Sequence, residues 1–318
     1  MISRSWFASA VGDERELLQR ATTLLQTECI DSDRKLNELL QNTVMDGQVN
    51  LATALFYQYI LAHEKHGTAY SRVQRQTIAK PTPDTSAHIV IVPGMFAKEK
   101  PDIGGDGALL KTIASSLGLT VSTAPTNTQA SVSENADVLH QYLQQMQSDH
   151  VWIVSLSRGS ADVKFMLSRH KTATYLPIVK QWISVSGIVT GTPLFQRILK
   201  RPVYAKAVSL LCTLRGISAR LPVELDASYP FWSESCDQYP FGVTHVAPIP
   251  LDWHVTRPVQ PRYARLKHLG PTDGIVMLTE LLAQQGTIYP IWGADHMLRV
   301  PNLANHFYQL IEYLKEDL

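Results

Sequence analysis

The chain has 318 residues, of which 45% are hydrophobic and 18% are charged, so it can bury a sizeable globular core. There are 29 basic against 28 acidic residues, and this net charge of +1 supplies no global field that favours nucleic acid or an anionic membrane. No apolar run approaches the roughly 18 residues that span a bilayer, so we expect no integral membrane segment.

Cysteine and histidine spacing predicts neither a disulfide framework nor a metal site. Cys29, Cys212 and Cys236 are far apart and odd in number, which predicts three reduced thiols. His63 and His66 are one residue too close for the zinc-binding HExxH motif, so we expect no metal and no other cofactor. The apolar stretch at the N-terminus is too short for a signal peptide, and the default prediction is a cytoplasmic protein.

Residues 1–86 are predicted to form a helical N-terminal extension followed by a linker. Apolar residues recur at helical spacing over 17–25 and again over 51–61. Residues 80–86 carry two prolines among small polar residues, which disfavours both helix and strand and indicates the linker. This part of the chain has no strand signal and no evident chemistry.

From residue 87 the pattern changes to short apolar runs rich in β-branched residues, typical of strands buried on both faces of a parallel sheet. These runs lie at 88–92, 151–154, 182–185, 243–249 and 287–292. Helical patterns fall between several of them, at 108–117, 134–146 and 161–167. The alternation predicts an α/β fold over 87–318, with a mostly parallel central sheet and helices on both faces.

The sharpest local signal is Ser155-Leu156-Ser157-Arg158-Gly159, between a predicted strand and a predicted helix. A nucleophile elbow, G-x-S-x-G, needs this context and small residues two positions before and after the serine. Such a turn raises the Ser157 hydroxyl above the sheet and leaves the backbone N–H of Arg158 free to bind an oxyanion. We therefore predict Ser157 as a nucleophile, and the alternative is an ordinary polar turn.

Residues 191–242 break the alternation and are too long for a simple connection. We predict a mostly helical cap insertion that covers the carboxyl edge of the sheet. About half of its large apolar side chains should be packed core, and the others should roof the cleft above Ser157. With one aromatic residue from an earlier turn, the candidate substrate-binding residues are Phe96, Phe195, Leu199, Phe231 and Trp232.

A serine nucleophile needs a general base, and the base needs an orienting acid. Where G-x-S-x-G supplies the nucleophile, the usual chain order is serine, acid, histidine. His296 lies just past the last predicted strand, and Asp273 lies in a Gly/Pro turn ahead of a predicted helix at 276–282. We therefore predict a catalytic triad of Ser157, Asp273 and His296.

The sequence offers other candidates for these two roles. Asp252, near the end of another predicted strand, is the second choice for the acid. Asp295 adjoins His296, so its side chain is badly placed to reach the far imidazole nitrogen, and we interpret it as a turn former. His254 and His268 are interpreted as structural.

An oxyanion hole needs a second donor. The strand at 88–92 ends at Pro93-Gly94-Met95, and the turn after this strand is the place for that donor, so we predict the Met95 N–H. Gly94 lets the backbone approach closely. The glycines of 104–107 lack the lysine of a phosphate-binding P-loop, and we expect a flexible loop that borders the substrate cleft.

Four segments resemble bacterial α/β-hydrolases of the lipase and esterase type: PGM (93–95), SLSRG (155–159), GPTDGIV (270–276) and WGADHML (292–298). The resemblance covers 87–318 and implies the α/β-hydrolase fold, with the triad and the Met95 oxyanion position named above. Pro93 and Ser155 stand where the family pattern has a histidine and the first elbow glycine. Residues 1–85 resemble no family.

These observations lead us to expect a serine hydrolase that cleaves a small-molecule or lipid-like carboxylic ester through an acyl-enzyme. The abundance of apolar side chains favours an apolar acyl chain or ring. One alternative is an acyltransferase, a thioesterase or a cyclising enzyme of a biosynthetic pathway with the same triad. Another is a non-catalytic ligand-binding relative, which a serine-directed probe would fail to label.

Overall fold

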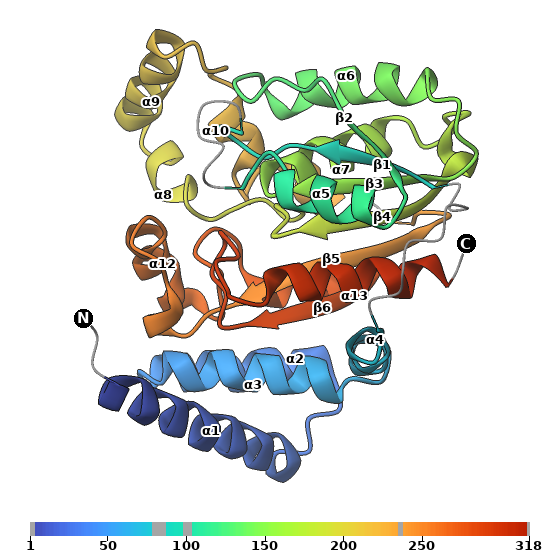
Figure 1. Ribbon diagram of the computed structural model, residues 1–318. Helices are drawn as coiled ribbons and strands as arrows, with labels where there is room; N and C mark the ends of the chain where they lie inside the picture. The colour runs from blue at the N-terminus through green and yellow to red at the C-terminus, as the bar shows by residue number, and fades with distance from the viewer. Residues whose placement is uncertain (1–3, 78–86, 98–103, 235–237, 317–318) are drawn as a thin grey trace.

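The computed structural model describes residues 4–77, 87–97, 104–234 and 238–316 (Figure 1). Six strands form one parallel sheet in the order β2-β1-β3-β4-β5-β6. Their bounds are β1 His88–Val92, β2 Thr120–Thr123, β3 Val151–Leu156, β4 Val179–Val185, β5 Gly242–Ile249 and β6 Thr287–Trp292. The predicted parallel α/β architecture is confirmed, while the predicted linker at 80–86 lies outside the described residues.

One strand was not predicted. β2 has the sequence Thr-Val-Ser-Thr and pairs only with β1, at the edge of the sheet. Its residues are half-buried or exposed, so it lacks the apolar run that marks the buried strands. Its β-branched residues favour a strand, and pairing with β1 places it in the sheet without an apolar run.

Helices cover both faces of the sheet (Figure 1). α5 (Ala108–Ser116) and α13 (Leu303–Lys315) share one core with the sheet, and α6 (Val132–Gln144) and α7 (Arg158–Arg169) share the other. β3 is fully buried and supplies alternate residues to the two cores: Ile153 packs toward α6 and α7, and Trp152 packs toward α5 and α13. This two-sided burial explains the unbroken apolar run of β3.

The N-terminal extension packs against the end of the sheet formed by β6 (Figure 1). It consists of α1 (Arg4–Thr27), α2 (Asp33–Met45), α3 (Val49–Ala62) and α4 (Glu64–Gln74). Leu36, Leu40 and Phe56 belong to the same buried cluster as Ile153 and Ile288 of the sheet. The extension and the sheet therefore share one continuous core.

The edge strand β6 is protected in two ways. The N–H of Ile288 donates to Nδ1 of His66 in α4, at 3.1 Å, so the extension satisfies a backbone group of the edge. Two residues on, Pro290 has no N–H to leave unpaired. The proline that weakens the strand pattern in the sequence thus fits an edge position.

The insertion between β4 and β5 is helical, as predicted. It contains α8 (Gln196–Leu199), α9 (Pro202–Leu214), α10 (Leu221–Leu225) and α11 (Pro230–Glu234). In Figure 1, α8 and α9 stand at the upper left, above α12 (Gln260–Leu266). Among the described residues, no helix is long and apolar enough to cross a membrane.

The predicted helix at 276–282 is a short 3-10 helix, η5 (Leu278–Ala283), instead. Its first residues are held in a turn, where Thr272 Oγ1 donates to the carbonyl of Val276 and Leu278 N–H donates to the carbonyl of Pro271. These bonds to Pro271 and Thr272 hold residues 276–278 in a turn, so they do not form the first turn of an α-helix.

Candidate active site

Ser157 sits in a strained turn between β3 and α7. Its φ and ψ are 48° and −115°, a combination that costs a non-glycine residue of order 1–3 kcal/mol. Backbone hydrogen bonds hold it there: Ser157 N–H donates to the carbonyl of Val185, and Ile188 N–H donates to the carbonyl of Ser157. A strained residue in a strand-to-helix turn is the backbone arrangement of a nucleophile elbow.

The two small residues that flank this turn have different reasons to be small. A Cβ added to Gly159 would lie 2.5 Å from the carbonyl oxygen of Val92, which leaves no room for a side chain. Ser155 is fully buried, and its Oγ accepts a hydrogen bond from Trp182 Nε1 at 2.8 Å and bonds Ser160 Oγ at 2.8 Å. The serine is therefore accommodated at the position where the family pattern has glycine.

The structure brings the three predicted triad residues together. Ser157 Oγ lies 2.8 Å from His296 Nε2, and His296 Nδ1 lies 2.7 Å from Asp273 Oδ2. When Nδ1–H donates to the carboxylate, Nε2 carries a lone pair that accepts the Ser157 proton. Such a hydrogen-bonded series can serve as a nucleophile, a general base and an orienting acid.

Asp273 is fully buried and its carboxylate is well held. The N–H groups of Ile275 and Val276 donate to Oδ1 at 2.8 and 2.9 Å, which leaves Oδ2 for His296. The backbone is also linked, because His296 N–H donates to the Asp273 carbonyl at 3.0 Å. Asp273 and His296 are thus fixed to each other by two separate hydrogen bonds.

The rival acids are occupied elsewhere. Asp252 Oδ2 accepts from Lys267 Nζ at 2.8 Å. Asp295 accepts from Thr256 N–H and Oγ1–H and from Met297 N–H, so it stabilises the turn that carries His296.

His254 and His268 lie outside the hydrogen-bonded series. His254 Nε2 contacts Glu14 Oε1 of α1 at 3.0 Å, and His268 is exposed in the 3-10 helix η4 (Lys267–Leu269). Neither is hydrogen-bonded to Ser157 among the described residues.

The predicted oxyanion donors flank Ser157. Arg158 is the first residue of α7, so its N–H has no acceptor within the helix. A Cβ on Gly94 would lie 3.6 Å from Ser157 Cβ, which places the 93–95 turn directly beside Ser157. Gly94 N–H donates to the carbonyl of Gly105, which ties this turn to the glycine loop.

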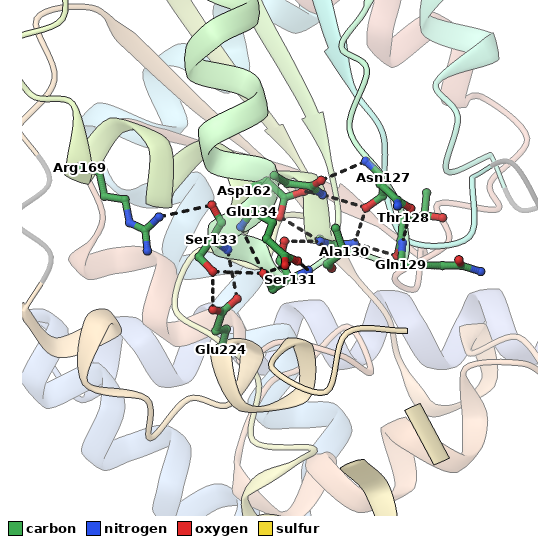
Figure 2. Close-up of polar contacts among 12 residues, drawn as sticks. Asn127, Thr128, Gln129, Ala130, Ser131, Ser133, Glu134, Asp162, Arg169 and Glu224 are labelled. Carbon is green, nitrogen blue, oxygen red and sulfur yellow. Dashed lines mark hydrogen bonds and ion pairs between the residues drawn. The ribbon is translucent and has the colours of Figure 1, made fainter. Parts of the chain in front are cut away.

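The Arg158 side chain has a role that the sequence did not indicate. It is buried and donates to the carbonyls of Asn127, Thr128, Ala130 and Ser131, at 2.7–3.3 Å. It also lies 3.4 Å from Asp162, and Figure 2 shows Asp162 beside this loop. Burial raises the pKa of Asp162 to about 6, against the opposing effects of Arg158 and Asn135. The network anchors the first turn of α7 and hence the turn at Ser157.

A largely apolar cavity of about 170 Å³ opens beside Ser157 and His296. Met95 and the glycines of the 104–107 loop border it. The remaining wall comes from β3, β4, α5, the turn after β6 and α13: Leu109, Leu110, Leu156, Val185, Ser186, Met297, Leu298, Leu303 and Phe307. Helix α13 and the His296 turn therefore build much of this wall.

The five predicted substrate-binding residues do not line this cavity. The Phe231 and Trp232 rings lie 3.7 and 5.6 Å from the Phe165 ring of α7, centroid to centroid. Phe195 packs against the same core, Leu199 is half-buried in α8, and Phe96 lies in the turn after β1. Packing against Phe165 of α7 accounts for the placement of Phe231 and Trp232.

The sequence matches no family model and no curated protein. Solved structures do resemble the fold. A carboxyl esterase of metagenomic origin has a TM-score of 0.60 at 16% identity, covering 77% of this chain and 80% of its own. The mature form of a Bacillus licheniformis lipase has a TM-score of 0.54 at 18% identity, covering 70% and 89%. At these identities the likeness shows the α/β-hydrolase fold, which this chain has.

Proposed function

We propose that this α/β-hydrolase-fold chain is a serine hydrolase that cleaves a carboxylic ester through an acyl-enzyme. The single observation that carries the proposal is the hydrogen-bonded series from Ser157 through His296 to Asp273, with distances of 2.8 and 2.7 Å. A carboxyl esterase and a lipase are among the solved structures with a similar fold, which is compatible with this chemistry.

In the first half-reaction, Ser157 Oγ attacks the ester carbonyl carbon while His296 Nε2 takes the hydroxyl proton. The bond from that carbon to the alcohol oxygen then breaks, and His296 returns the proton to the leaving alcohol. In the second half-reaction, water attacks the acyl carbon while His296 Nε2 takes a proton from the water. The bond from that carbon to Ser157 Oγ then breaks, and His296 returns the proton to Ser157 Oγ. Asp273 holds the imidazole and stabilises its positive charge throughout.

The N–H groups of Arg158 and Met95 are assigned to the oxyanion that forms in each half-reaction. One such donor contributes about 3–4 kcal/mol to transition-state stabilisation in comparable sites. A change of side chain does not remove a backbone N–H. The hydrogen bonds that anchor the Arg158 side chain help to position the Arg158 N–H.

We assign the acyl group of the substrate to the apolar cavity beside Ser157. Its volume of about 170 Å³ is close to the roughly 150 Å³ of an engineered apolar cavity that binds benzene. A short aliphatic acyl group or a single ring fits this volume, whereas a long chain must extend past its opening. Leu110, Leu298 and Phe307 supply the apolar wall.

The proposal is tested by labelling with a fluorophosphonate probe and by turnover of p-nitrophenyl esters from acetyl to palmitoyl. Ser157→Ala should abolish labelling and lower kcat by several orders of magnitude. Ser155→Ala is the matched control, and it should keep the label while losing some stability, because Trp182 Nε1 loses its acceptor. Labelling of Ser157→Ala at the wild-type rate would contradict the proposal. Product analysis with added alcohol distinguishes hydrolysis from acyl transfer.

A further inference from the structure

Helix α9 is unusual because none of its 13 residues is buried. Val203, Tyr204, Leu210, Leu211 and Leu214 make up half of the large exposed apolar side chains in the described part of the chain. Val203 is 78% exposed and Leu214 is 75% exposed. Soluble proteins rarely leave so many large apolar side chains together in water without a partner.

These side chains lie on one side of the helix. Val203, Ala207, Leu210 and Leu214 follow the spacing i, i+4, i+7, i+11, and Tyr204 and Leu211 run beside them. Together they cover an arc of about 120° at 100° per residue. The half-buried residues lie on the opposite side: Ala205, Val208, Ser209 and Cys212. The helix thus turns a broad apolar arc outward.

Basic residues flank this arc, and its own stretch of chain carries no acidic residue. Lys200, Arg201, Lys206 and Arg215 are exposed. The sequence has no aspartate or glutamate from 163 to 223. The near-zero net charge of the chain therefore hides a local positive field around α9.

α9 stands at the edge of the sheet where Ser157 lies. After the helix ends, Ser218 N–H donates to the carbonyl of Gln129 at 2.8 Å. Gln129 belongs to the loop whose carbonyls hold the Arg158 side chain, directly behind the nucleophile turn. Figure 1 shows α9 as the outermost helix on this side of the molecule.

We propose that α9 docks the protein on an anionic lipid surface. The outward arc inserts among the acyl chains near the headgroups, and the flanking lysines and arginines bind lipid phosphates. At 13 residues α9 is too short to span a bilayer, so it lies in the plane of the surface. Docking brings the edge of the sheet that carries Ser157 to a surface on which apolar esters collect.

A second copy of the chain is a poorer occupant than lipid. In a two-fold dimer through α9, the same patch meets itself, so Lys206 and Arg215 of one copy approach the basic residues of the other. The acid-free stretch offers no countercharge, and like charges across an interface are unfavourable. An anionic lipid surface supplies both the apolar environment and the countercharge.

The test is co-sedimentation of the full chain with phosphatidylcholine vesicles, with and without phosphatidylglycerol. Each basic residue near an anionic surface contributes about fivefold, so wild type should bind the anionic vesicles at least tenfold more tightly. Leu210→Ser with Leu214→Ser, and separately Lys206→Gln with Arg215→Gln, should each lower that binding about tenfold or more. Met45→Ser, at another exposed apolar residue, and Lys171→Gln are the matched controls and should bind like wild type.

Binding is measured without turnover, so Ser157→Ala should bind vesicles like wild type even if the proposed ester hydrolysis is wrong. Equal binding of wild type to both vesicle types overturns the proposal. It is also overturned if the leucine pair has wild-type vesicle affinity but converts a dimer to a monomer, because a second copy then covers α9. Should the leucine pair fail to fold, the Lys206 and Arg215 pair still decides.

Discussion

At the scale of single residues, Gly159 and Ser155 show why the elbow tolerates a serine at one flank and not a larger residue at the other. Gly159→Ala would force a Cβ to within 2.5 Å of the Val92 carbonyl and 2.7 Å of the Pro93 carbonyl. We expect a loss of about 2–3 kcal/mol in the free energy of unfolding, measured by urea denaturation, together with slower probe labelling. Wild-type stability and labelling of this variant would mean that the turn does not need its close approach to β1.

The second prediction for a single residue concerns Asp273, the proposed orienting acid. Asp273→Asn should lower kcat roughly a thousandfold or more, because the amide cannot stabilise the His296 imidazolium. Asp252→Asn is the matched control: it removes the charge that pairs with Lys267 and should retain most activity. Steady-state kinetics of the two variants decide between them, and the opposite ranking would move the acid to Asp252.

At the scale of elements, α1 is joined to the loops around the site through one carboxylate. Glu14 accepts hydrogen bonds from Trp253 Nε1 and Trp292 Nε1 and contacts His254 Nε2, at 3.0–3.1 Å. Burial opposes ionisation, but these bonds and the His254 charge together lower the pKa of Glu14. Trp292 ends β6, four residues before His296, so α1 supports the strand end that leads to the base.

Glu14→Ala should therefore destabilise the contact between the extension and the sheet. We expect a loss of about 2 kcal/mol, because two indole donors lose their acceptor. Glu16→Ala, an exposed carboxylate on the same helix, is the control and should change the melting temperature by little. Equal melting temperatures for the two variants, measured by calorimetry, would show that the Glu14 bonds contribute nothing to docking.

At the scale of the whole molecule, His66 makes the attachment of the extension sensitive to pH. Burial, together with the nearby His63 and Lys65, lowers the pKa of His66 to about 4 from an ordinary 6.5. The folded state keeps the ring neutral so that Nδ1 accepts from Ile288 N–H, whereas the unfolded chain binds a proton near pH 6.5. The stabilisation is thus complete above pH 6.5 and is lost as the pH falls toward 4, by at most about 3 kcal/mol.

Urea denaturation at pH 7.5 and pH 5 measures this effect. His66→Asn keeps an acceptor oxygen near the position of Nδ1 but cannot titrate, so its stability should fall less between the two pH values than that of wild type. An identical pH dependence for both proteins would place the loss on other groups.

The sequence by itself determined the features that depend on local order along the chain. The buried strands are continuous apolar runs, and the elbow is a strand–turn–helix with small flanks, so both can be read from neighbouring residues. The order serine, acid, histidine along the chain also matches the order expected for G-x-S-x-G proteins. A parallel sheet brings the segments after its strands to the same edge, where these three residues lie. The structure accordingly brings these three side chains within hydrogen-bonding distance.

Only the tertiary structure decided which distant side chains share a surface. Phe231 and Trp232 have the same apolar character whether they face Phe165 or a substrate, and composition cannot separate the two. Three features join segments far apart in sequence: the cavity that Leu298 and Phe307 share with Ser157, the bonds of Glu14, and the carbonyls around Arg158. A sequence pattern records which residues prefer burial, but the packing of helices on the sheet selects their partners.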